Sequence, residues 1–114
     1  MGNYVKLSKV VEKLNLKNLT PDVDMTEKKV MVPDINRPAL QLTGFFEHFA
    51  YERVQLIGCV EYTFLENVEE DEKEKIYDML LSYKIPCIIF CRNLKPDDSL
   101  IEKANKANVP VFST

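Results

Sequence analysis

One uncharged run, residues 85–91, constrains the fold more than any other part of the sequence. It does not alternate polar and apolar side chains, and it is rich in β-branched and aromatic residues, which is typical of a strand covered on both faces. A polar turn follows, and then Leu100, Ile101 and Ala104 stand at helical spacing. A second apolar run, 109–112, completes a strand–helix–strand unit, which we expect to be parallel with a right-handed crossover.

An earlier strand and a long helix extend this unit. A compact apolar stretch ends in glycine, and a segment with acids at its start and lysines later follows it, as a helix dipole favours. The sequence therefore predicts an α/β fold of three layers around a small, mostly parallel βαβαβ sheet. The predicted strands lie near 54–57, 86–90 and 110–113, and the predicted helices at 69–83 and 97–107.

The N-terminal half carries smaller elements. Residues 7–14 place apolar side chains at helical spacing, and a short strand is expected at 29–32. A proline-bounded loop, 34–38, then leads to a helix start at 39–42.

The stretch 59–67 is ambiguous. Val60, Tyr62 and Phe64 alternate as in a strand, although the same stretch also fits one helical face. A helical turn is favoured because Gly58 ends the preceding strand and Glu61 suits a first helical turn.

Composition narrows the function classes. The 114 residues fit one domain, and 46% of them are hydrophobic. The net charge is −3 and the sequence has no basic stripe, so nucleic acid and anionic membranes are poor candidates as partners. No apolar run approaches the roughly 20 residues of a membrane span. Cys59, Cys87 and Cys91 are an odd number, which fits reduced structural thiols in a cytoplasmic protein.

No catalytic, cofactor-binding or metal-binding motif is found. The three glycines, at positions 2, 44 and 58, cannot form a glycine-rich phosphate loop. His48 is the only imidazole and lacks partners at metal-ligand spacing. The carboxylates within 66–74 are interpreted as a solvated helix start.

A weaker pattern concerns the carboxyl ends of the predicted strands, where ligands bind in parallel α/β sheets. Glu61 follows the first strand, Arg92 and Asn93 follow the second, and Thr114 follows the third. These residues could hold an anionic small molecule. A surface arginine and a turn asparagine are the favoured alternative, and Asn36 with Arg37 in the loop 34–38 is a similar case.

A recognisable pattern runs through 34–38, 40–46 and 52–58 with Glu61, Phe64 and Leu65, and it continues through 85–89, Pro96, Leu100, Ala104, 109–111 and Thr114. Together these segments resemble the N-terminal domain of HPr kinase/phosphorylase. The resemblance covers essentially the whole chain, and its most specific part is 34–58, although Ala39 stands where glycine is expected.

The resemblance implies a bacterial cytoplasmic enzyme that phosphorylates a serine of the phosphocarrier HPr, and removes that phosphate, in carbon catabolite regulation. In this family ATP or pyrophosphate, with magnesium, binds a C-terminal P-loop domain, and the whole protein is a hexamer. Residues 1–114 are therefore expected to be the N-terminal domain alone, ending where a linker would begin. The implied fold resembles the UDP-sugar-binding domains of peptidoglycan-precursor (Mur) ligases.

Three hypotheses follow for this domain. The first is a non-catalytic regulatory or assembly domain, with its own C-terminal kinase domain, HPr or further copies of the chain as partners. The second is a sensor that binds an anionic metabolite or nucleotide-sugar near Glu61, Arg92, Asn93 and Thr114. The third is a docking module that uses Phe45, Phe46 and Phe49, although such a cluster is more often part of a core.

Overall fold

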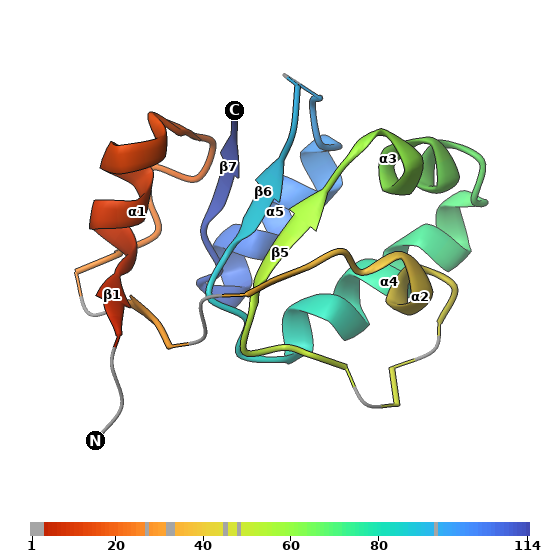
Figure 1. Ribbon diagram of the computed structural model, residues 1–114. Coiled ribbons are helices and arrows are strands. Elements are labelled where there is room, and N and C mark those ends of the chain that lie inside the picture. The colour runs from red at the N-terminus through yellow and green to blue at the C-terminus, as the bar shows by residue number, and fades with distance from the viewer. Residues whose placement is uncertain (1–3, 27, 32–33, 45, 48, 93) are drawn as a thin grey trace.

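A five-stranded sheet lies at the centre of the computed structural model, which describes residues 4–26, 28–31, 34–44, 46–47, 49–92 and 94–114. Helices and short strands surround this sheet in a mixed α/β fold (Figure 1). In chain order the elements are β1 (Val5–Lys6), α1 (Leu7–Leu14), β2 (Lys17–Asn18), β3 (Lys29–Val30), β4 (Ile35–Asn36), α2 (Ala39–Leu42), β5 (Val54–Ile57), α3 (Cys59–Glu66), α4 (Glu70–Ser82), β6 (Ile88–Phe90), α5 (Asp98–Ala107) and β7 (Val111–Ser113).

The strand order of the sheet is β2-β7-β6-β5-β4. The neighbours β4, β5, β6 and β7 pair in parallel, with Leu56 opposite Ile89 and Ile89 opposite Phe112. At the other edge β2 pairs antiparallel with β7, and β1 and β3 form a separate antiparallel pair. The sheet is thus mixed, and β5, β6 and β7 occupy the positions at which the sequence predicts strands.

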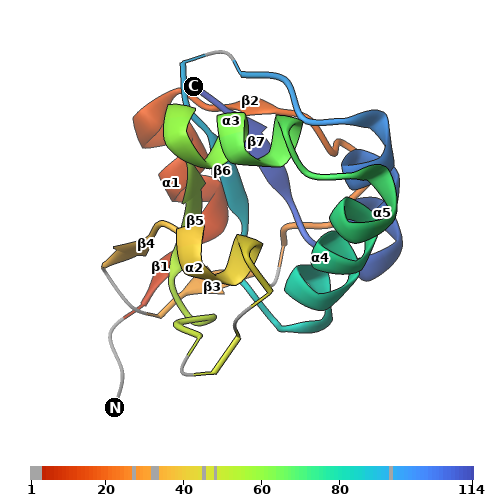
Figure 2. The same ribbon diagram turned by 90° about the vertical axis from the view of Figure 1, so that its right-hand side faces the viewer.

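Two hydrophobic clusters lie on opposite faces of the sheet. Ile88, Phe90 and Val111 pack with α4 and α5 in one cluster, whereas Ile89 and Phe112 pack with Leu7 of α1 and with other N-terminal residues in the other. Successive strand residues point to opposite faces, so an uncharged run with no alternation is what a sheet covered on both sides requires. Figure 2 shows the resulting layers, with the sheet between α1 and the pair α4 and α5.

The two long helices form where the sequence predicts them. The first turn of α4 carries acidic side chains, which stabilise the helix by interacting with the positive amino end of its dipole. The apolar face of α4 is buried against the sheet. Helix α5 ends at Asn108, which adopts the left-handed conformation with φ 60° and closes the helix. The ambiguous stretch 59–67 is also helical, as α3.

One prediction for the N-terminal half is wrong. Residues 34–38 are not simply a loop, because Ile35 and Asn36 form the edge strand β4 beside β5. The Asn36 side chain donates a hydrogen bond of 2.7 Å to the Gln55 side chain on β5. A two-residue strand before a proline has no periodic pattern, so sequence alone cannot reveal it.

The aromatic cluster belongs largely to the core. Phe49 is buried and meets Tyr83 of the α4–β6 connection at 4.9 Å between ring centroids, and half-buried Phe46 stacks on the same Tyr83 at 5.7 Å. Phe45 and His48 lie outside the described residues. Within the described ranges no helix is both long and apolar enough to span a membrane.

Candidate functional site at the carboxyl edge of the sheet

The turn from β5 into α3 is organised by one carboxylate. Glu61 is only 4% exposed, and its Oε1 accepts a hydrogen bond of 2.7 Å from the backbone N–H of Gly58, the residue before the helix. A glutamate three residues into a helix that bonds back to the N-cap N–H satisfies a donor that the helix itself cannot satisfy. Glu61, from which the sequence predicts a helix start here, is therefore also the residue that caps the start of the helix.

The same oxygen of Glu61 also accepts a hydrogen bond of 3.0 Å from Nη2 of Arg37, which follows β4. The parallel pairing of β4 and β5 places the two residues at the same edge of the sheet. The Arg37 side chain is 53% exposed. One face of this ion pair therefore stays in water while the carboxylate is buried.

Gly58 lies directly against this ion pair. A Cβ atom at position 58 would overlap the guanidinium of Arg37 and lie 3.1 Å from Oε1 of Glu61. The backbone of Gly58 is extended, with φ −97°, so its conformation alone does not require glycine. The close approach of Arg37 favours glycine, although the end of that side chain is half exposed and can move. This glycine therefore leaves room for Arg37 in the position that pairs with Glu61.

Arg37, Gly58 and Glu61 together leave little chemistry open at this turn. A phosphate cradle needs free backbone N–H groups and a glycine that lets a phosphate approach. The N–H of Gly58 is bonded to Glu61, and the guanidinium of Arg37 fills the space over the glycine. The charges of arginine and glutamate also offset each other at the point where an anion would sit.

Of the four predicted ligand residues, the structure brings Arg92 and Thr114 together. The backbone N–H of Arg92 donates a hydrogen bond of 3.0 Å to Oγ1 of Thr114, and both residues are exposed. Arg92 has φ 55°, a left-handed turn conformation. Asn93 lies outside the described residues, and the contacts of Glu61 are with Arg37 and Gly58.

A second polar cluster, which the sequence does not reveal, ties α4 to the start of α5. Oδ2 of Asp97 accepts hydrogen bonds from the hydroxyl of Tyr77 at 2.7 Å and from Nζ of Lys73 at 3.3 Å. Burial, together with the Asp97 carboxylate, raises the pKa of Tyr77. Burial lowers the pKa of Lys73, but the carboxylates of Asp97 and Glu70 together outweigh that effect and the pKa is raised. These shifts favour a neutral phenol and a charged ammonium, so the cluster is a structural clasp.

Metal ligation finds no support in the described part of the chain, where no three His, Cys, Asp or Glu residues are grouped to hold an ion. Cys87 is buried, Cys91 is partly buried and Cys59 is exposed at the start of α3. The burial of Cys87 raises the pKa of its thiol to about 12, which keeps it protonated.

Comparison with known families gives a direct result. The family model described as HPr Serine kinase N terminus matches residues 5–114. The chain belongs to this family. It is 46% identical over 110 residues to an HPr kinase/phosphorylase of Lachnoclostridium phytofermentans, with 96% of the chain and 36% of the relative covered. It is 32% identical over 114 residues to that of Latilactobacillus sakei subsp. sakei, again covering 36% of the relative.

The chain therefore spans about a third of the length of the curated relatives it matches. Among solved structures, it resembles the crystal structure of the CBS and DRTGG domains of the regulatory region of Clostridium perfringens pyrophosphatase, complexed with the activator diadenosine tetraphosphate. The TM-score is 0.61 at 17% identity, over 96% of the chain and 40% of that structure. This likeness concerns the fold alone.

Proposed function

We propose that the chain is the non-catalytic, regulatory or assembly domain of a bifunctional HPr serine kinase/phosphorylase in the bacterial cytoplasm. The observation that carries the proposal is the family match over residues 5–114 together with the greater length of the relatives. In the relatives, the remaining length of about two thirds would supply the kinase domain, with its ATP or pyrophosphate and magnesium. HPr and carbon catabolite regulation belong to that whole protein.

The β5–α3 turn supports the non-catalytic half of this proposal. It has the strand-to-helix geometry in which nucleotide-binding proteins carry a glycine-rich loop. Here its glycine is covered by Arg37, and its leading N–H is bonded to the chain's own Glu61. Phosphoryl transfer needs positioned phosphates and charge stabilisation, and this turn offers neither.

The test is a phosphorylation assay with the 114-residue chain, purified HPr, ATP and magnesium. The full-length kinase/phosphorylase of Lachnoclostridium phytofermentans is the positive control, and phosphoserine on HPr is measured by mass spectrometry. We expect phosphoserine only with the full-length enzyme. Phosphoserine formed by the 114-residue chain would contradict the proposal.

A second assay addresses the regulatory or assembly role. In the full-length relative, the segment matching 5–114 is deleted, and both oligomeric mass and HPr phosphorylation are compared with the intact enzyme. We expect the deleted form to keep phosphoryl transfer and to change its oligomeric state or its response to effectors. If the two forms agree in mass and in response, the domain has neither role.

The docking alternative gains little from the structure, because Phe49 is buried and Phe46 is half-buried against Tyr83. Ligand binding near Glu61, Arg92, Asn93 and Thr114 stays a prediction, and the engagement of Glu61 with Arg37 does not favour it. The kinship with peptidoglycan-precursor ligases is likewise an expectation from the family resemblance.

A further inference from the structure

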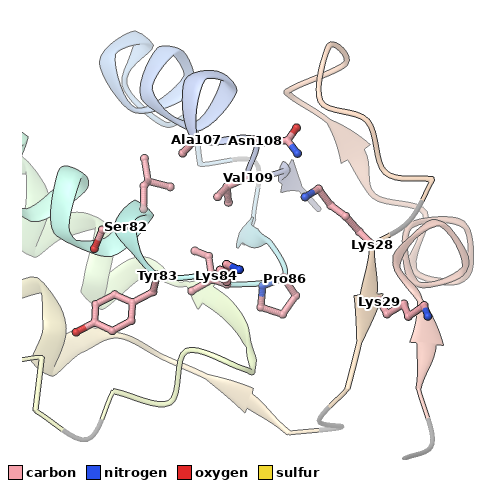
Figure 3. Close-up of a pocket in the computed structure, with 11 residues that line it drawn as sticks. Lys28, Lys29, Ser82, Tyr83, Lys84, Pro86, Ala107, Asn108 and Val109 are labelled. Atoms are coloured by element: carbon pink, nitrogen blue, oxygen red, sulfur yellow. The ribbon is translucent and has the colours of Figure 1, made fainter.

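A cavity of about 580 Å³ lies at the amino ends of β6 and β7, away from the Arg37–Glu61 pair. Three backbone segments meet there: the connection from α4 to β6, the connection from α5 to β7, and residues 28–29 (Figure 3). A volume of this size lies within the range of roughly 300–1,000 Å³ typical of small-molecule sites.

The frame of the cavity is fixed by backbone hydrogen bonds. The N–H of Lys28 bonds to the carbonyl of Met25 at 3.1 Å, and its own carbonyl accepts the N–H of Leu7 at 3.1 Å. On the facing side, the N–H of Val109 bonds to the carbonyl of Ala104 at 2.9 Å. The walls are therefore held by the N-terminal layer and by α5.

The charged groups that line the cavity are all cations. Lys28, Lys29 and Lys84 contribute to it, and no carboxylate is present among the described residues of its lining, although the chain as a whole is acidic. Lys28 and Lys84 form no ion pair with any described residue. The pKa of Asp24 is lowered mainly by hydrogen bonds from Thr26, and the nearby charge of Lys28 adds to this as the weakest cause. Lys29 instead places its ammonium 4.3 Å from the centroid of the Tyr4 ring.

The side chains add two further features. Figure 3 shows Lys28 extending into the open space toward Asn108, whereas Lys29 points away. Buried Leu81, Ile85 and Val109 form an apolar floor. A bare inorganic anion would match the lysines and leave this floor uncovered, so an anion attached to an organic body fits better.

From these contacts we infer that the cavity binds a small organic phosphate. The phosphate lies between the ammonium groups of Lys28 and Lys84, within reach of the Asn108 amide, and the organic body covers the floor. Unpaired lysines on facing walls are suited to a dianion, since each can donate a charge-assisted hydrogen bond. Binding at this site does not depend on the proposed kinase context, because every contact lies within the chain.

The alternative explanation for these lysines is that they only offset the negative dipole charge at the carboxyl ends of α4 and α5, because both helices end at the cavity. That role would affect stability without any ligand. Two double variants are therefore compared. The first combines Lys28→Gln and Lys84→Gln. The control combines Lys9→Gln and Lys75→Gln, and it removes two charges from exposed positions outside the cavity. Free energies of unfolding are measured for both pairs.

Binding is followed by amide chemical shifts of the isotope-labelled 114-residue chain. The probes are adenosine 5′-monophosphate, ribose 5-phosphate, inorganic phosphate and adenosine, each titrated to millimolar concentration. The two esters distinguish a nucleotide from a sugar phosphate as the source of the same chemistry. We expect at least one ester to shift residues 82–86 and 107–109, more tightly than inorganic phosphate or adenosine.

The double variant at Lys28 and Lys84 should weaken ester binding by at least about tenfold, and the control pair by less than about twofold. Affinity should also fall as salt is raised. The inference is overturned if neither ester shifts these residues, if inorganic phosphate binds as tightly as the esters, or if both variant pairs bind alike. Because no kinase assay is involved, failure here leaves the proposed function standing.

Discussion

The guanidinium of Arg37 and the carboxylate of Glu61 meet at 3.0 Å directly over Gly58, although the two residues are 24 positions apart in the chain. The pair joins the edge strand β4 to the first turn of α3. It also favours glycine at position 58, since a side chain there would push the guanidinium away from Glu61.

Gly58→Ala should therefore destabilise the fold by about 0.5–1.5 kcal/mol, because the added methyl group pushes the half-exposed end of Arg37 away from Glu61 and the hydrogen bond between them is lost. The measurement is the free energy of unfolding in urea. In an Arg37→Ala background the same substitution should cost at least about 0.5 kcal/mol less, since the overlapping group is gone. An equal cost in both backgrounds would show that the backbone, and not Arg37, demands glycine.

The clasp between α4 and α5 predicts which substitutions should lower the free energy of unfolding most. Tyr77→Phe removes one hydrogen bond to Asp97 and should cost about 0.5–1.5 kcal/mol. Asp97→Ala should cost more, about 1–3 kcal/mol, because it leaves both Tyr77 and the largely buried Lys73 without this partner.

The matched control for this order is Asp98→Ala. Asp98 is the neighbouring exposed carboxylate in the first turn of α5, and its loss should change the unfolding free energy by only about 0.3–1 kcal/mol. If Asp98→Ala costs as much as Asp97→Ala, the helix dipole rather than the clasp accounts for the effect.

Alkaline pH should weaken the fold through Cys87. Its thiol pKa is raised by burial from 9.0 to about 12, so the unfolded chain loses this proton first. The contribution is fully present below pH 9 and is lost progressively as the pH rises toward 12, by at most about 1.4 kcal/mol per pH unit.

The measurement compares the wild-type chain with Cys87→Ala by urea unfolding at several pH values. The stability difference between the two should be constant below pH 8 and should narrow above pH 9. A difference that does not change between pH 7 and pH 11 would mean that Cys87 is not the group responsible.

The thiols should also differ in reactivity toward a charged aromatic disulfide reagent at neutral pH. Cys59 is exposed and should react first, Cys91 is partly buried and should react more slowly, and Cys87 should react only after unfolding. Cys59→Ser should abolish the fast phase alone. Release of three equivalents at one rate from the native chain would contradict this placement.

Sequence patterns predict the long elements because each of them depends on the pattern of polar and apolar residues within its own segment. The run 85–91 has no polar position since both faces of β6 are covered, and Asn108 ends α5 as its left-handed preference suggests. The family resemblance, too, rests on patterns that the match over 5–114 confirms.

The candidate sites depend on contacts between distant residues, which no local pattern reports. Arg37 is noticed in the sequence only as a residue in a proline-bounded loop, and its pairing with Glu61 follows from the parallel register of β4 and β5. The basic cavity is missed because the rule for parallel sheets directs attention to the carboxyl ends of the strands. Lys28 and Lys84 both line the cavity at the opposite edge, although they are 56 positions apart in the numbering.

The antiparallel strand β2 has a consequence for biosynthesis. It pairs with β7, and Oγ1 of Thr20 accepts a hydrogen bond from the backbone N–H of Val111, which lies 91 positions further along the chain. Contacts of such long range form late, because a large loop must close before they contribute. On the ribosome, the first-made layer must therefore wait for nearly all of these 114 residues to emerge before it can dock.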